Sequence, residues 1–195
     1  MSYNKKISLI LKNHIDLGKK IIQDNKFIED INLLCDMAKH TIQKKKKIIF
    51  FGNGGSASDS QHLATELVVK FKKKKNPISA LSLTTDTSIL TAIGNDFDFE
   101  FIFTRQLQAL YSKGDLVIPI STSGNSKNII NALKYCKKIK AQTFSFLGNN
   151  GGKAIHLSKN SLIIPSNDTA RIQEFHILIG HILCEFLDEK ISAKK

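Results

Sequence analysis

The sequence predicts an α/β fold, a three-layer sandwich built on a five-stranded parallel sheet with strand order 2-1-3-4-5 and preceded by two extra helices. Short continuous apolar runs recur along the 195-residue chain, as in strands that are buried on both faces of a parallel sheet. Segments with helical spacing of apolar residues separate most of these runs, which is the alternation expected of successive βαβ units.

Helical spacing predicts two helices before the first strand. Ile7, Leu11 and Ile15 follow this spacing within about residues 3–22, and a second helical pattern runs from Phe27 to about Ile42. These helices have more apolar positions than one sheet face needs, so we expect them to pack between subunits. The expected strands are IIFF (48–51), ISALSL (78–83), LVIPI (116–120), FSFL (144–147) and LIIP (162–165).

Length and composition predict one globular domain over residues 1–195, with the two helices in 1–45 and the α/β core in 46–190. The chain is 42% hydrophobic and 24% charged, which is ordinary for such a domain. No apolar run approaches the about 20 residues of a membrane span, and the N-terminus lacks the small-residue cleavage site of a secretion signal. We therefore expect a cytoplasmic protein without a membrane partner.

The three cysteines are expected to be reduced core thiols. Cys35, Cys136 and Cys184 are far apart, odd in number and surrounded by apolar residues of expected helices. This distribution does not fit a disulfide framework or a zinc cluster.

The net charge of +12 raises the question of a nucleic-acid partner. The lysines form short runs at 44–47, 72–75 and 137–138, where the pattern indicates helix ends or junctions between elements. No aromatic stacking residues are interleaved with them. A solvated surface is therefore favoured over nucleic-acid binding, although a basic surface can help to attract an anionic substrate.

Two loops after expected strands carry the residue types of a ligand site. GNGGSAS (52–58) follows the first strand and STSGNS (121–126) follows the third, and these strands are neighbours in the expected order. Glycines let the backbone approach a ligand, and the following helix N-terminus favours negative charge. The second loop adds the hydroxyls of Ser121, Thr122, Ser123 and Ser126, which suits a phosphate monoester. A turn that caps a helix beginning near Asn125 is the alternative, and it accounts for only one or two of them.

A nucleotide cofactor is a weaker interpretation of the first loop. Gly52, Gly54 and Ala57 match the dinucleotide pattern G-x-G-x-x-A. However, no acidic residue occupies the end of the second strand, because Asp86 comes later, beyond two threonines.

Two helical segments carry polar residues that call for partners. His62 and Glu66 are four residues apart and share a helix face, a spacing that serves a metal site, an acid/base pair or an ordinary surface contact. The last helix, RIQEFHILIGH (171–181), is apolar except for a polar side with Gln173, His176 and His181. Because buried polar groups need partners, the two segments are predicted to face each other.

Six motifs in this order, GNGGS, QHLATEL, GNDFDFE, STSGNS, GNNGGK and RIQEFHILIGH, resemble the sugar isomerase (SIS) family, and within it the phosphoheptose isomerases. The resemblance covers nearly the whole chain and implies a flavodoxin-like SIS domain. It implies a homotetramer that converts sedoheptulose 7-phosphate to D-glycero-D-manno-heptose 7-phosphate through an enediol, with one zinc ion per subunit. The product would enter ADP- or GDP-heptose and bacterial surface polysaccharides, a lipopolysaccharide or a capsule.

The resemblance also assigns residues. It implies that Glu66 is the base at carbon and His181 the group that moves protons at oxygen. The implied zinc ligands are His62, Glu66, Gln173 and His181. The implied substrate contacts are Asn53, Gly54, Gly55, Glu66, Asn95, Asp96, Ser121, Thr122, Ser123, Ser126 and Gln173, with phosphate on the four hydroxyls.

Two departures from the family pattern leave positioning open. Lys70 stands where some relatives have arginine, and Ala170 where some have aspartate, so Lys70 and the nearby Asp168 receive no role. The alternative function is a noncatalytic SIS regulator that binds a replication initiator protein. Such relatives lack the glutamate and the final histidine that are present here as Glu66 and His181, which favours the enzyme.

Overall fold

A computed structural model describes residues 2–74 and 76–192, and it confirms the predicted α/β sandwich. In chain order the elements are α1 (Tyr3–Ile22), α2 (Asn25–Gln43), β1 (Ile48–Gly52), α3 (Gly55–Val68), β2 (Ala80–Ser82), α4 (Thr87–Asp96), η1 (Phe99–Phe101), α5 (Ile102–Leu110), β3 (Leu116–Ser121), α6 (Lys127–Lys138), β4 (Gln142–Gly148), η2 (Ala154–His156), β5 (Asn160–Ile164) and α7 (Thr169–Ser192).

The five strands form one sheet in the order β2-β1-β3-β4-β5, and every neighbouring pair is parallel. All residues of β1 and β3 are buried, which explains why these central strands appear in the sequence as uninterrupted apolar runs. The register pairs Ile48 of β1 with Ala80 on one side and Leu116 on the other. The carboxyl ends of β1 and β3 therefore lie side by side, which brings their following loops together.

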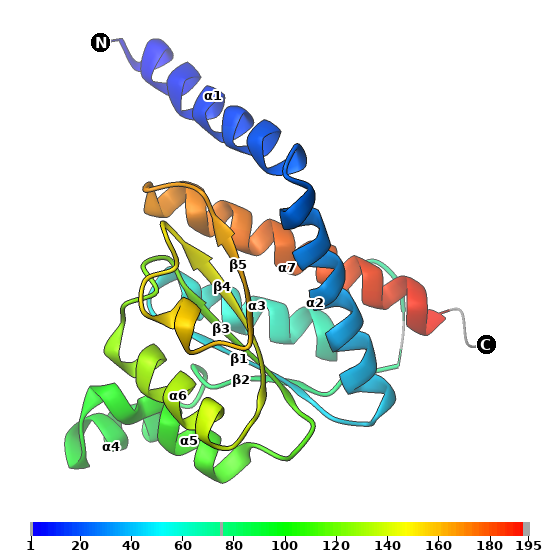
Figure 1. Ribbon diagram of the computed structural model, residues 1–195, viewed down its shortest axis with the longest axis vertical. Helices are drawn as coiled ribbons and strands as arrows, with labels where there is room; N and C mark the ends of the chain where they lie inside the picture. Colours follow the sequence, from blue (N-terminus) through cyan, green and yellow to red (C-terminus); the bar gives the residue numbers. More distant parts are fainter. Residues whose placement is uncertain (1, 75, 193–195) are drawn as a thin grey trace.

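Helices cover both faces of the sheet (Figure 1). One apolar core joins the sheet to α2, α3 and α7 and to the end of α1, while the other joins it to α4, α5 and α6. The three cysteines are buried in the two cores, as predicted. Burial raises the pKa of Cys35 to about 11 and that of Cys136 to about 12, so both stay protonated at neutral pH.

Helix α1 extends as an arm beyond the rest of the chain (Figure 1). Only Leu17 and Ile21 of this helix are buried, whereas apolar side chains nearer its start are exposed, among them Ile7, Leu11 and Ile15. The His14 Nδ1 atom lies 2.7 Å from Glu174 at the start of α7 and anchors the arm there. An exposed apolar stripe of this kind is typical of an interaction surface.

No described helix combines the length and the apolar character that a membrane crossing requires.

Candidate active site

The site is built where α3 and α7 run side by side (Figure 1). A Cβ atom on Gly180 of α7 would overlap the side chain of Leu63 on α3, and a Cβ on Gly55 would overlap the amide of Gln173. Glycine at these two positions therefore permits the close approach of the helices. Gly55 precedes Leu63 along α3, and their partners Gln173 and Gly180 come in the same order along α7. The two helices are therefore parallel in this contact.

The two predicted polar faces meet at His62 and His181. Their Nε2 atoms are 2.9 Å apart, so one ring donates a hydrogen bond and the other accepts it. A carboxylate oxygen of Glu66 lies 3.5 Å from His62 Nε2. The Glu66 side chain is 21% exposed and that of His62 is 47% exposed, which leaves the cluster open to a ligand from solvent.

Electrostatics at the cluster favour the neutral form of the His181 ring. Burial lowers the pKa of His181, the neighbouring His62 lowers it further, and the Glu66 carboxylate acts in the opposite direction. One turn before His62, burial raises the pKa of Asp59 to about 6, against the opposing effect of His62. The Asp59 Oδ2 atom is buried without a hydrogen-bond partner among the described residues. Asp59 was not among the predicted site residues, although its position one turn before His62 was a signal for it.

His176 does not share the polar face, and its inclusion there was wrong. Its ring is fully buried against the sheet, where Nε2 lies 3.0 Å from the carbonyl oxygen of Leu147 in β4. Five residues advance a helix by about 140°, so His176 points to the sheet while His181 points to α3. Burial lowers the pKa of His176 to about 4, which keeps the ring neutral and makes Nε2 the donor to Leu147.

His176 predicts an acid-sensitive stability. Between pH 4 and 6.5 the unfolded chain binds this proton and the folded chain does not, so the stability is complete above pH 6.5 and falls as the pH drops to about 4. The shift corresponds to about 3 kcal/mol. Urea unfolding at pH 4.5 and 7 should show that His176→Gln lowers stability at pH 7 yet removes much of the difference between the two pH values. The exposed His40→Gln is the control, and an unchanged difference in His176→Gln would contradict the assignment.

The hydroxyl loop, residues 121–126, faces the glycine loop, residues 52–58, as predicted. The side-chain amides of Asn53, after β1, and Asn128, at the start of α6, exchange two hydrogen bonds of 2.9 Å. Ser121 Oγ accepts from the N–H of Gly124, and Ser123 Oγ accepts from the N–H of Asn125, so two of the four hydroxyls serve the turn. Ser126 precedes α6 without a side-chain cap bond. Within the described residues, the hydroxyls of Thr122 and Ser126 remain available to an anion.

Three predicted site residues lie apart from the histidine pair. Gln173 stands two helical turns before His181, about 12 Å along the axis, with its amide against Gly55. Asn95 and Asp96 form the last residues of α4, in the layer on the opposite face of the sheet, where both are exposed. A single chain therefore does not bring these two residues to the histidine pair, and the GND segment (94–96) forms the end of a helix.

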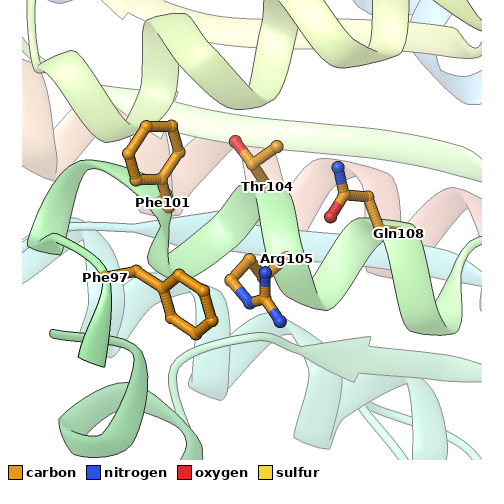
Figure 2. A pocket seen from close by; sticks show the side chains of 5 residues that line it. All are labelled: Phe97, Phe101, Thr104, Arg105 and Gln108. Atoms are coloured by element: carbon orange, nitrogen blue, oxygen red, sulfur yellow. The ribbon is translucent and has the colours of Figure 1, made fainter. Parts of the chain in front are cut away.

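A cavity of about 250 Å³ opens in this opposite layer, away from the histidine pair (Figure 2). The guanidinium of Arg105 lies 3.7 Å from the centre of the Phe97 ring there, and the Thr104 hydroxyl is buried without a partner among the described residues. The walls are made by Phe97, Phe101, Thr104, Arg105 and Gln108. None of these five residues was predicted to bind substrate, and the wall holds no acid/base pair.

The side chains of His62, His181 and Glu66 are suitable ligands for a metal ion. Two imidazole nitrogens from separate helices converge on one point with a carboxylate beside them, and these are donors that zinc prefers. Among residues 2–74 and 76–192, no three His, Cys, Asp or Glu side chains already stand in a metal-binding arrangement. The convergence equally suits a shared proton, so the zinc site stays a prediction.

Comparisons with known proteins identify the family of this chain. The family model described as SIS domain matches residues 12–148. A phosphoheptose isomerase from Clostridium acetobutylicum is 43% identical over 185 residues, which cover 95% of this chain and 94% of the relative. The chain belongs to the phosphoheptose isomerase family. Another family member, from Aquifex aeolicus, is 54% identical over 148 residues, 76% of this chain and 78% of that protein.

The fold of the family is also matched in three dimensions. The structure of the phosphoheptose isomerase from Neisseria gonorrhoeae superimposes with a TM-score of 0.89 and 34% sequence identity, and it covers 96% of this chain and 100% of that one. The likeness in fold therefore extends beyond residues 12–148, which the family model matches, to the last helix α7.

Proposed function

We propose that this chain is a phosphoheptose isomerase, an aldose–ketose isomerase that converts sedoheptulose 7-phosphate to D-glycero-D-manno-heptose 7-phosphate in heptose biosynthesis. The observation that carries the proposal is the cluster of His62, Glu66 and His181 on adjoining helices. The names of the relatives supply the substrate class. The noncatalytic alternative is not favoured, because the cluster provides a carboxylate base and an imidazole where a regulator needs neither.

The chemistry requires two kinds of proton transfer. Glu66 removes the proton from C1 of the ketose, and the electrons form the C1–C2 double bond of a cis-enediol. His181 carries the proton between the oxygens on C1 and C2. Return of a proton from Glu66 to C2 completes the aldose. Groups of these types each contribute about 10²- to 10⁴-fold to such reactions.

Residue spacing is compatible with a long, open-chain substrate. His62 is the seventh residue after Gly55 on α3, which places the histidine pair about 10 Å along the helix from the glycine loop. Three bonds of an extended chain advance about 3.5 Å, so six C–C bonds cover about 7 Å before the phosphate ester is added. Phosphate at Thr122 and Ser126, beside the glycine loop, would therefore leave the carbonyl end near the histidine pair.

Zinc is proposed as the cofactor, to be held by His62, Glu66 and His181. Gln173, the further ligand that the resemblance implies, would have to turn its amide from Gly55 toward the histidine pair to complete the set. A bound zinc ion supplies a Lewis acid that polarises the carbonyl group and stabilises negative charge. The residues of the chain would place the sugar and exclude water. Because an atom that binds zinc cannot accept a proton, Glu66 and His181 would transfer the protons described above through an atom that does not hold the ion, or after the ion has left.

A homotetramer is proposed as the working form. The exposed apolar residues of α1 need a cover, and exposed Leu178 and Ile182 flank His181 on α7. Asn95 and Asp96 lie in the layer remote from the histidine pair of their own chain, so a second copy is the means by which they would reach a substrate. A homotetramer would therefore cover the apolar surfaces and bring Asn95 and Asp96 to a substrate.

The purified protein is expected to isomerise sedoheptulose 7-phosphate in preference to five- and six-carbon ketose phosphates. A coupled assay over such a panel measures kcat/KM, and light scattering on the same preparation should give four times the chain mass. Folded protein without turnover on any of these substrates would refute the enzyme and favour the noncatalytic alternative. A monomer at micromolar concentration would refute the tetramer.

A further inference from the structure

The first part of the connection between α3 and β2 is fastened to the last helix. This part, residues 69–74, forms a strap. The Asp188 carboxylate on α7 accepts hydrogen bonds from the backbone N–H groups of Lys72, at 2.9 Å, and Lys73, at 3.2 Å. Asp188 is only 2% exposed, and Lys72 Nζ also binds Glu185 at 2.6 Å. A buried carboxylate that accepts two backbone N–H groups is a strong, directional anchor.

The strap places an aromatic ring on a proposed catalytic histidine. The Phe71 ring stacks on the His181 ring with centroids 5.2 Å apart and planes 27° from parallel. The edge of His181 meanwhile faces His62, with ring centroids 5.1 Å apart. His181 is thus held on one face by Phe71 and at its edge by His62.

We propose that Phe71 is a positioning residue that fixes the ring orientation of His181, and that Asp188 sets the position of Phe71 through the strap. Rotation about the outer side-chain bond of histidine is soft, and a half-exposed imidazole would sample several orientations. Stacking against a ring whose backbone is anchored removes that freedom and keeps Nε2 directed at the proposed reaction centre. The catalytic consequence rests on the proposed function, while the orientation itself does not.

The alternative role for Phe71 is structural. Its side chain is partly buried against the core on this face of the sheet, so its loss could act through stability alone. If the role is structural, the kcat of Phe71→Leu and of Phe71→Tyr should fall in step with thermal stability. If Phe71 positions His181, the aromatic ring of Phe71→Tyr should restore the kcat that Phe71→Leu loses. The strap offers a control in Lys74→Ala, which changes an exposed side chain of the same segment.

The test compares Phe71→Leu, Phe71→Tyr, Asp188→Asn and Lys74→Ala with wild type. In metal-free protein, the ring protons of His181 should show an upfield NMR shift from Phe71 that is lost in Phe71→Leu and kept in Phe71→Tyr. In the isomerase assay, Phe71→Leu should lower kcat about 10-fold with little change in KM. Phe71→Tyr should restore kcat, Asp188→Asn should give a smaller loss, and Lys74→Ala should match wild type.

Unchanged His181 resonances in Phe71→Leu would overturn the proposal, as would wild-type kcat in that variant at equal thermal stability. A loss that Phe71→Tyr fails to rescue would also overturn it and would assign Phe71 a structural role. If the wild-type protein does not turn over sedoheptulose 7-phosphate, the proposed substrate is refuted, and the NMR comparison alone decides whether Phe71 orients His181.

Discussion

Replacing Glu66 by glutamine is expected to lower kcat for sedoheptulose 7-phosphate by about 10²- to 10⁴-fold. Glutamine keeps the size and the hydrogen-bonding oxygen of the side chain but cannot accept a proton from carbon. The side chain is 21% exposed and its described contact is with His62, so the fold should survive the change. Steady-state kinetics and a thermal melt of the same sample check both statements.

The matched control for this change is Glu29→Gln, which replaces an exposed glutamate on α2 in the same way. It should leave kcat at the wild-type value. Retention of full activity in Glu66→Gln would show that another group takes the carbon proton, and Asp59, one turn before His62, would then be the first candidate to examine.

Replacing His181 by glutamine is expected to have an effect of similar size, about 10²- to 10⁴-fold on kcat, for a different reason. The amide cannot take up and release a proton at the sugar oxygens, and His62 loses its 2.9 Å partner across the α3–α7 contact. Because the remaining binding residues are unchanged, most of the effect should appear in kcat and not in KM.

His40→Gln serves as the control, because His40 is exposed near the end of α2. Light scattering should show the same assembly for wild type, His181→Gln and His40→Gln. A His181→Gln variant with wild-type kcat would reject the assignment of proton transfer at oxygen to this residue.

Periodicity predicted most of the fold because burial leaves a clear signal in the sequence. The apolar runs at 48–51 and 116–120 are central strands without an exposed residue, and they were predicted to within one residue at each end. The run at 78–83 predicted too long a strand. In the structure only Ala80–Ser82 pair as β2, and the Ile78 N–H donates to Leu67 at the end of α3. Such edge positions depend on tertiary contacts that periodicity does not encode.

The sequence also predicted that His62 and His181 would meet, since each lies on a helix face that needs a polar partner. The prediction for His176 was wrong, because the polar residues grouped on one side of α7 make two different contacts. His176 faces the sheet, whereas His181 faces α3. Apolar periodicity did not indicate the contacts of Phe71 and Asp188, because these contacts involve the irregular strap and periodicity predicts only helices and strands. The position of Asn95 and Asp96 in the opposite layer could not be read from a GND segment either.

The central claim is that the α3–α7 cluster carries out proton transfer at carbon, and solvent-exchange NMR tests it most directly. In D₂O the wild-type enzyme should produce heptose 7-phosphate with deuterium at C2, because the enediol exchanges protons with solvent through Glu66. Glu66→Gln should incorporate none over the same period. Deuterium entering C2 at the wild-type rate in that variant would contradict the account.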